Sequence, residues 1–493
     1  MPASLFKENH EMMLPLLCDL VNLSLDTGSM EGVKTAHILP LIKELGLDSS
    51  GFNNYRPISN LASLGKLIER VVYSRLNEHM TVNNLEIPFQ SGYKKKHSTE
   101  ILLIRVVNDI LIASSESKAT VVMMLDLSAA FDTVDHAKLL KILKYELGIR
   151  GTALKWFESY LSGRCQKVRI GDTESDEITI LFGVPQGSVL GPVLFNIYIR
   201  SLYNTARGLK FAIHGYADDH QVYKNFSKAD EYSIMTYDVP ECFDQISQWM
   251  IQHFLQINPG KTEIVVFGSP SVLKSLIVNG VFLKCGTCVR FSPVAKNLGF
   301  LLDSQLSFKS QVCKLKCTLF SKLRSIQKMK PFLTQFQVKL LVQAIVLSSL
   351  DFCNSLYYGC NQKVLHQLQM LQNSACRVIF GIKKRDSVKE KMRQLHWLQI
   401  QQRIEFKIIL FVFKSIHSLA PSYLSELFYP VDLSEKRAPT LKINNTHSFN
   451  ARAFQISGAK LWNNLPSQIR EIDDIIKFKQ NLKTHLFKAS YNV

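Results

Sequence analysis

The sequence contains no hydrophobic run of the length needed to cross a bilayer. The apolar stretch IILFVF at 408–413 has only six residues, whereas a spanning helix needs about 20. The first residues, MPASLFKENHEMM, carry acidic side chains early and no apolar segment of signal-peptide length. We therefore expect an intracellular protein that is not inserted in a membrane.

Cysteine is also too sparse for a disulfide framework, because ten cysteines are scattered over 493 residues. Two pairs still leave an alternative open, since Cys285 and Cys288 form a CxxC and Cys313 and Cys317 a CxxxC. Four thiolates in this order can bind zinc. The competing interpretation is that Cys288 lies in a strand, TCVRF, and that Cys313 and Cys317 lie on a helix face.

Acidic residues are scarce in the last part of the chain. Residues 304–493 hold 29 Lys and Arg against 10 Asp and Glu, a net charge of +19, whereas residues 1–303 have a net charge of −1. The whole chain carries +18, which favours a polyanionic partner, either nucleic acid or an acidic membrane surface. A length of 493 residues predicts two or three domains.

The hydrophobic pattern predicts an α+β fold in which strands and helices alternate irregularly up to about residue 303. We expect helices over 61–80, over 99–115 with Ser98 as the N-cap, and over 189–204. TVVMMLDL (120–127) is typical of a buried strand, and strands are expected on both sides of the turn GYADDH (215–220). From 304 to about 430 the chain is expected to be almost wholly helical.

Carboxylates stand at the ends of two of these expected strands. Asp218 and Asp219 are adjacent at the hairpin tip, and Asp126 ends the apolar strand 92 residues earlier. An unpaired buried charge costs several kcal/mol, so such groups belong at an edge or in a cleft. If folding brings the three together, they form a site for two Mg²⁺ ions. Taken alone, paired acids at a turn are usually solvated turn residues.

An ordered set of motifs favours the metal site. In chain order these are NNYRPISNLASLGKLIER (53–70), QSGYKKKHSTE (90–100), LDLSAAFDTVDH (125–136), GVPQGSVLGPVLFNIYI (183–199), YADD (216–219), INPGKTEIVVFG (257–268) and NLGFLLDS (297–304). Together they resemble the reverse transcriptases of non-LTR (LINE-type, jockey-like) retrotransposons. The resemblance is strong over about 24–303 and less specific in the rear.

The resemblance implies a right-hand polymerase: fingers and palm with an antiparallel palm sheet, followed by a mostly helical thumb and C-terminal region. The corresponding boundaries are an N-terminal extension at 1–35, fingers and palm at 36–303, a basic thumb-like region at 304–430 and a C-terminal region at 431–493. The implied activity is RNA-directed DNA polymerisation. Two alternatives are a catalytically lapsed nucleic-acid-binding remnant of a retroelement and a maturase-like RNA-splicing cofactor.

The resemblance also assigns the catalytic groups. Asp126 and Asp218 would bind two Mg²⁺ ions, or Mn²⁺, with Asp219 assisting. The carbonyl of Leu127 would complete one coordination shell. Lys261 matches the lysine that protonates the pyrophosphate leaving group, although it could equally be a solvated lysine at a strand edge.

Five further residues are implied to hold the nucleotide. Phe131 would be the steric gate that excludes a ribose 2′-OH, unless it is simply a core residue. Gln186 would contact the incoming nucleotide, and Gly187 would let the backbone approach closely. Arg56 and Lys66 would grip the triphosphate.

The sequence departs from the family pattern in three places. His220 follows the YADD motif where relatives often have Thr, and we expect it to tune a contact behind the metal ligands. The run GYKKKHS replaces an Arg-containing one. No endonuclease is expected within this sequence. The implied partners are an RNA template, a DNA primer and dNTPs, and the implied location is the nucleus and cytoplasm.

Overall fold

The computed structural model describes residues 8–43, 46–128, 130–257, 262–431, 440–443 and 451–491. These residues form two compact units that interleave along the chain. The first unit comprises Met1–Tyr93, Leu125–His220 and Cys242–Thr262, and the second comprises Lys94–Met124, Gln221–Glu241 and Glu263–Val493. The predicted boundaries at 35, 303 and 430 stay predictions.

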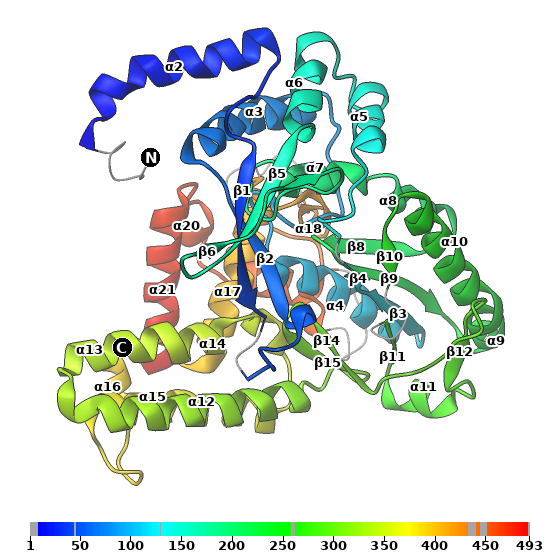
Figure 1. The fold of residues 1–493 in the computed structure, drawn as a ribbon. Helices are drawn as coiled ribbons and strands as arrows, with labels where there is room; N and C mark the ends of the chain where they lie inside the picture. The colour runs from blue at the N-terminus through cyan, green and yellow to red at the C-terminus, as the bar shows by residue number, and fades with distance from the viewer. Residues whose placement is uncertain are drawn as a thin grey trace. The chain divides into compact units, whose positions relative to one another are not determined.

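The first unit contains a sheet with the strand order β2-β1-β5-β6 (Figure 1). Its strands are β1 (Thr35–Ile42), β2 (Tyr55–Asn60), β5 (Arg164–Ile170) and β6 (Thr173–Glu174), and β7 (Ile178–Ile180) pairs with β5. β1 runs antiparallel to β2 and parallel to β5. This sheet fixes β2, which carries Arg56.

Helices accompany this sheet in the same unit. They are α2 (His10–Thr27), α3 (Ser63–Val82), α5 (His136–Tyr145), α6 (Gly151–Leu161), α7 (Gly191–Tyr198) and α8 (Leu202–Gly208). The helix expected over 61–80 is therefore confirmed as α3. The apolar positions Ile68, Val72 and Leu76 face its buried side, at the spacing that the sequence predicted.

The single helix expected over 189–204 is wrong, because the chain forms α7 and α8 there instead. The amides of Arg200 and Leu202 bond to carbonyls three residues back, 3.3 and 3.1 Å away, which bends the chain between the two helices. The first of these helices, α7, also starts later than expected. The amides of Val189 and Leu190 donate to the carboxylate of Glu69 and α7 begins at Gly191.

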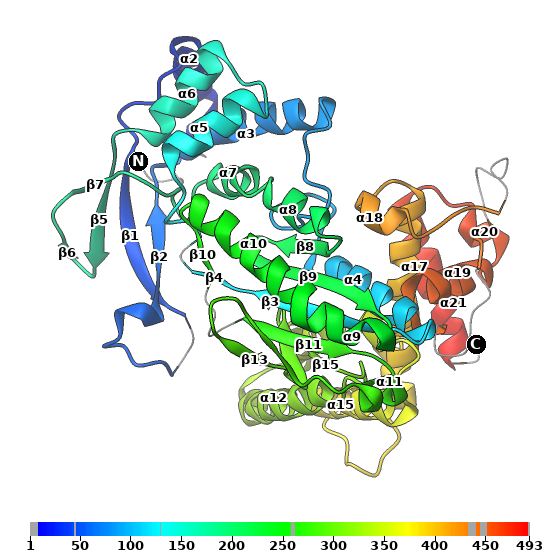
Figure 2. The same ribbon diagram turned by 90° about the vertical axis from the view of Figure 1, so that its right-hand side faces the viewer.

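The expected hairpin is confirmed as β8 (Ala212–Tyr216) and β9 (Asp219–Phe226), joined by Ala217 and Asp218. β9 also pairs with β3 (Ala119–Leu125), and β3 pairs with β11 (Glu263–Phe267). The strand order of this sheet is therefore β11-β3-β9-β8 (Figure 2). β3 and β11 are antiparallel, with Val122 opposite Val265. Nearly every residue of β3 is buried, as the apolar TVVMMLDL run predicted.

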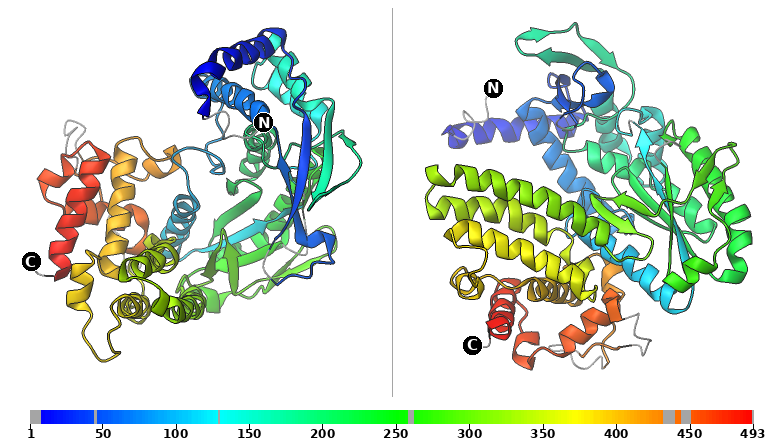
Figure 3. Two further views of the ribbon diagram at one scale, coloured as in Figure 1. Left: turned by 60° about the vertical axis from the view of Figure 1, so that its left-hand side comes forward. Right: turned by 90° about the horizontal axis from the view of Figure 1, so that it is seen from below.

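The second unit is otherwise mostly helical. The helix over 99–115 is confirmed as α4 (Thr99–Ser115), and its N-cap Ser98 accepts a hydrogen bond from the amide of Ile101 at 3.2 Å. The rear helices include α12 (Lys309–Met329), α13 (Gln335–Val342), α15 (Gln362–Phe380), α17 (Ile400–Ile416), α19 (Phe454–Asn463) and α21 (Ile475–Tyr491). α12 and α15 run side by side (Figure 3). The expected helical stretch after 304 is confirmed.

Shorter elements complete the fold. They are the strands β4 (Leu127–Ser128), β10 (Gln256–Ile257), β12 (Gly280–Phe282), β13 (Cys288–Arg290), β14 (Val294–Asn297) and β15 (Phe300–Asp303), and the helices α9 (Glu231–Ser233), α10 (Val239–Gln252), α11 (Pro270–Ser275), α14 (Ser348–Asp351), α16 (Lys389–Gln394), α18 (Ser422–Ser425) and α20 (Ser467–Arg470). No helix among the described residues is long and apolar enough to span a bilayer.

Candidate active site

The hairpin tip and the end of β3 bring two carboxylates together in the first unit. Asp218 and Asp126 are both half-buried, and Asp219 is exposed. Burial raises the pKa of Asp218, and the neighbouring carboxylate of Asp126 raises that pKa further. A backbone hydrogen bond and the Arg56 guanidinium act in the opposite direction. Asp126 and Arg56 are therefore both within electrostatic reach of Asp218.

The donor set of this pair suits a hard divalent cation, because carboxylate oxygens are the ligands that Mg²⁺ prefers. The repulsion that raises the pKa of Asp218 is removed when a cation lies between the two carboxylates. The described residues contain no group of three or more His, Cys, Asp or Glu side chains placed to hold a metal ion. The expected group of three carboxylates is therefore not found among these residues; the oxygen donors of Asp126 and Asp218 suit a divalent cation, and Asp219 as a third ligand stays a prediction.

The backbone of the tip is held in a conformation that is unusual for its residues. Ala217 has φ +58°, in the left-handed region that side chains with a Cβ seldom adopt. The side chain of Gln90 stabilises this conformation of Ala217 through two hydrogen bonds. Its Nε2 donates to the carbonyl of Ala217 at 3.0 Å, and its Oε1 accepts from the amide of Ala217 at 2.9 Å. Gln90 is completely buried, so these bonds are not exchanged for water.

The segment around Gln90 lies directly against the hairpin. The amide of Gly92 also donates to Gln90 Oε1, at 2.8 Å. A Cβ at Gly92 would lie 2.3 Å from the amide nitrogen of Ala217, so only glycine fits this position. Asn196 of α7 donates to the carbonyl of Gly92 at 3.0 Å. The QSGY motif is thus a structural support for the turn that carries Asp218.

His220 contacts the backbone of Asp218, one of the predicted metal ligands. Its Nδ1 lies 2.9 Å from the carbonyl oxygen of Asp218. Burial lowers the pKa of His220 to about 4, so the ring is neutral at physiological pH. A neutral ring next to a carbonyl must carry its hydrogen on Nδ1, and His220 therefore donates to Asp218.

The Gln186 loop forms a second part of the site. Gln186 Nε2 donates to both carboxylate oxygens of Asp132 at 3.0 Å, and the amide of Ser59 in β2 donates to the carbonyl of Gln186 at 2.8 Å. Gly187 has φ +126°, and a Cβ there would lie 2.6 Å from the carbonyl oxygen of Ser59. The backbone at Gly187 thus approaches β2 closely, while the role of Gly187 toward the nucleotide stays a prediction. Burial raises the pKa of Asp132, although its bonds with Gln186 lower it.

Asp132 and Glu69 belong to the site but were not singled out from the sequence. Glu69 of α3 is buried, and one of its carboxylate oxygens accepts from the amides of Val189 and Leu190 at 2.6 and 3.1 Å. Burial raises the pKa of Glu69. Because these amides follow Gln186 and Gly187 closely, Glu69 fixes the end of their loop. The only signal in the sequence was a carboxylate on the predominantly apolar side of the helix expected over 61–80.

Phe131 lies in an aromatic cluster beside the carboxylates. Its half-buried ring stacks on Phe195 with centroids 4.9 Å apart, and the ring of Tyr93 meets it edge-on at 6.2 Å. Burial raises the pKa of Tyr93, and the charge of Asp218 raises it further, so the two residues are close. A ring held on two sides in this way can act as a rigid steric boundary.

The two predicted phosphate-binding cations take different positions. Arg56 is exposed on β2 and acts on Asp218, as described above. Lys66 lies in the first turn of α3 and acts on Glu69, whose pKa it lowers together with Arg164. The structure thus brings Arg56 to the carboxylate pair, whereas it relates Lys66 to the residue that holds the Gln186 loop.

The structure gives little information on the predicted roles of Leu127 and Lys261. Leu127 is in β4 and pairs with Ile257 of β10, directly after Asp126 in the chain. Lys261 lies outside the described residues. Both assignments stay predictions.

The cysteines of the zinc alternative do not assemble into a site. Cys285, Cys288, Cys313 and Cys317 are all exposed, and none of them forms a disulfide. Within the part of the chain that is described, no group of three metal-binding side chains includes them. Cys288 lies in β13, and Cys313 and Cys317 lie on α12, as the competing interpretation predicted.

Comparison with known proteins agrees with this geometry. Residues 46–309 match the family described as reverse transcriptase (RNA-dependent DNA polymerase), which is more than half of the chain. The chain therefore belongs to the reverse transcriptase family. This membership confirms the predicted α+β fold class of a right-hand polymerase.

The relatives are proteins of non-LTR retrotransposons. The RNA-directed DNA polymerase from mobile element jockey of Drosophila funebris is 29% identical over 356 residues, which are 70% of this chain and 38% of the relative. The probable RNA-directed DNA polymerases from transposons BS and X-element of Drosophila melanogaster are also 29% identical, over 70% of this chain. The chain thus spans under two-fifths of the length of these relatives.

A solved structure of apo telomerase from Candida tropicalis, truncated from its C-terminal domain, shows a weaker likeness. It has a TM-score of 0.39 and 9% identity, and the match covers 55% of this chain and 53% of the telomerase chain.

Proposed function

We propose that this chain is an RNA-directed DNA polymerase that transfers nucleotides from dNTPs to the 3′-OH of a primer annealed to an RNA template. The observation that carries the proposal is that Asp126 and Arg56 both act electrostatically on Asp218, at the hairpin tip that Gln90 holds by hydrogen bonds. Two carboxylates could hold divalent cations, and one guanidinium beside them could bind a triphosphate, which are the groups that a nucleotidyl-transfer site needs.

Reverse transcriptases generally use divalent metal ions, and we propose Mg²⁺, or Mn²⁺, for this chain. Asp126 and Asp218, with Asp219 and the carbonyl of Leu127, would hold two such ions. The bound ions supply charge neutralisation for the attacking and leaving oxygens. The chain itself orients these ligands, because Gln90 and His220 fix the turn that carries Asp218.

The nucleotide would be held by the surrounding residues. Arg56 would bind the triphosphate as a planar donor, with Lys66 as a second cation. Gln186 and Gly187 would face the incoming nucleotide, and the ring of Phe131 would occupy the space that a 2′-OH needs. Lys261 would donate the proton that the pyrophosphate leaving group takes up.

The proposed activity also implies a role for each region of the chain. The region 36–303 would supply fingers and palm, 304–430 a thumb that grips the primer–template duplex, and 431–493 a C-terminal region. The net charge of +19 over 304–493 supports phosphate binding of this kind. Replication of an element in a host genome implies activity in the nucleus and cytoplasm.

Primer extension tests the proposal directly. Purified protein with Mg²⁺, a DNA primer annealed to an RNA template and dNTPs should incorporate nucleotides, and Asp218→Ala should reduce the rate by about 1,000-fold or more because a metal ligand is lost. Asp172→Ala, which changes an exposed turn residue, is the matched control and should leave the rate unchanged. No incorporation by the unmutated protein would instead support the catalytically lapsed remnant.

A further inference from the structure

The connection between α12 and α13 exposes an unusual number of large apolar side chains. Phe332 is 87% and Phe336 66% exposed, and Met329 and Leu340 are 43% and 48% exposed. We call these four residues the tip patch. Phenylalanine is normally among the most buried residues, so a cluster of this kind on a protein surface marks an interaction site.

The backbone under the tip patch is well defined, so the exposure does not come from a frayed helix end. Thr334 caps α13 in a capping box, with Gln337 Oε1 accepting from the amide of Thr334 at 2.9 Å. Val338 and Val342 of α13 are fully buried. Phe336 and Leu340 precede these valines by two positions each, which places them on the opposite face of the helix.

The chain around the tip patch carries charge of one sign only. Residues 304–350 contain eight Lys and Arg and no Asp or Glu. On α12, which leads to the patch, Lys322, Arg324 and Lys328 are exposed. A surface that combines exposed aromatic rings with cations is complementary to unpaired bases joined by phosphates.

A second basic segment lies at the same end of the helices. Lys330, between Met329 and Phe332, donates from Nζ to the carbonyl of Val378 at 2.8 Å, near the end of α15. The loop that follows α15 carries the exposed residues Lys383, Lys384 and Arg385 (yellow in Figure 1). The contact of Lys330 therefore brings this loop to the side of the tip patch.

We propose that the tip patch binds single-stranded RNA. Bases would stack on Phe332 and Phe336, and the phosphates would meet the cations of α12 and of the loop 383–385. Single-stranded nucleic acid is favoured over a duplex because only unpaired bases present their faces to an aromatic side chain. The proposal rests on the proposed function, which supplies an RNA template with an uncopied, unpaired portion.

Binding of an RNA oligonucleotide that contains 2-aminopurine tests this site. The full chain should quench 2-aminopurine fluorescence as the base stacks, and Phe332→Ala/Phe336→Ala should abolish the quenching and weaken binding by about 10-fold or more. Phe282→Ala removes a similarly exposed ring (74%) from β12 and should leave both readouts unchanged. Equal quenching by the double variant and the unmutated protein would overturn the proposal.

The salt dependence of RNA binding tests the proposed role of the cations independently. Lys383→Ala/Lys384→Ala/Arg385→Ala should lower the dependence of log affinity on log salt concentration by about 2, since each phosphate contact on a single strand contributes about 0.7. An unchanged slope would contradict the proposed path of the strand.

Failure of this site can be distinguished from failure of the proposed function. Extension of a primer by one or two nucleotides, on a template whose unpaired portion is only that long, should proceed at the unmutated rate in the Phe332→Ala/Phe336→Ala variant, because such a template offers almost no unpaired RNA to the patch. A loss of duplex extension equal to the loss of RNA binding would assign the patch to the duplex grip and overturn the proposal. A change in mass by light scattering would assign it to a contact between two copies of the chain, and stronger binding of single-stranded DNA than of RNA would also refute it.

Discussion

Gln90 is the residue on which the geometry of the hairpin tip depends most. It satisfies the amide and the carbonyl of Ala217, a residue held in the left-handed region, and it also accepts from Gly92. Each of these backbone groups would lose its partner if the side chain were shortened, and a buried polar group left without a partner costs about 1–3 kcal/mol.

We therefore expect Gln90→Ala to lower kcat for primer extension by about 100-fold, because a small displacement of catalytic groups has an effect of this size. The KM for dNTP should change much less, since Gln90 supports the carboxylates and does not touch the nucleotide. Gln166→Ala, on β5, is the control. A kcat that falls no further in Gln90→Ala than in the control would show that the turn keeps its shape without the clamp.

His253, which follows α10, should make the stability of the protein depend on pH. It is buried and stacks on Trp249 with centroids 3.7 Å apart. Burial lowers the pKa of His253, the hydrogen bond to Trp249 raises it, and the charge of Lys138 lowers it. The folded protein therefore binds fewer protons at this site than the unfolded chain does below about pH 6.5.

The free energy of unfolding should therefore fall as the pH drops through and below about 6.5, and His253→Gln should reduce this dependence. Denaturant unfolding at pH 7.5 and pH 5.5 measures the difference. His366→Gln, at an exposed position of α15, is the control and should keep the full dependence. The same pH dependence in all three proteins would contradict the assignment.

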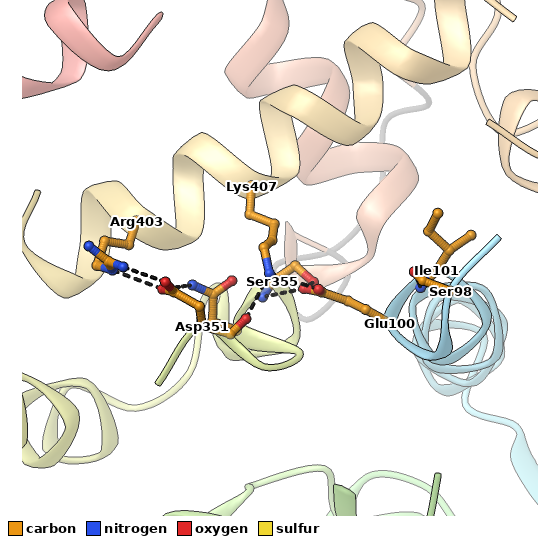
Figure 4. A network of polar contacts seen from close by, with 8 residues as sticks. Ser98, Glu100, Ile101, Asp351, Ser355, Arg403 and Lys407 are labelled. Carbon is orange, nitrogen blue, oxygen red and sulfur yellow. Dashed lines mark hydrogen bonds and ion pairs between the residues drawn. The ribbon is translucent and has the colours of Figure 1, made fainter. Parts of the chain in front are cut away.

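Among the elements, α4 and α17 are connected in the second unit by a network of charged groups (Figure 4). Lys407 of α17 donates to Glu100 of α4 at 2.8 Å and to the carbonyl of Asp351 at 2.7 Å. Ser355 donates its hydroxyl to Glu100 at 2.6 Å, and Arg403 pairs with Asp351. The network joins segments that are about 300 residues apart in the chain.

Lys407→Met should lower the free energy of unfolding of this unit by about 2 kcal/mol, because it leaves the largely buried carboxylate of Glu100 without its cation. Adding Glu100→Gln should recover part of the loss, since the double variant has no unpaired charge. Denaturant unfolding measures both. Lys363→Met, at an exposed position of α15, should have little effect, and a loss of the same size there would refute the role of the network.

The elements themselves followed from local sequence, but the contacts that shape the site did not. Periodicity and capping predicted α3, α4, the hairpin and the helical rear. The late start of α7 was missed because Glu69, 120 residues away, binds the amide of Val189, with which the helix was expected to begin. The clamp of Gln90 on Ala217 spans 127 residues and the bond of Gln186 to Asp132 spans 54. No local pattern encodes such pairs.

For the whole molecule, the central claim is that Asp126 and Asp218 jointly hold divalent ions for nucleotide transfer. The sequence placed these residues in two family motifs, and the structure relates the charge of Asp218 to those of Asp126 and Arg56. The other parts of the proposed function depend on this pair. The hydrogen bonds of Gln90, the Gln186 loop and the basic residues 304–493 would each support a reaction that needs the ions.

Binding of Mn²⁺, followed by electron paramagnetic resonance, tests this claim most directly. In the presence of an RNA–DNA primer–template and a non-hydrolysable dNTP analogue, the unmutated protein should bind two ions per chain, and both Asp126→Asn and Asp218→Asn should weaken that binding by at least 10-fold. Mn²⁺ binding that is the same in the unmutated protein and in both variants would contradict the account.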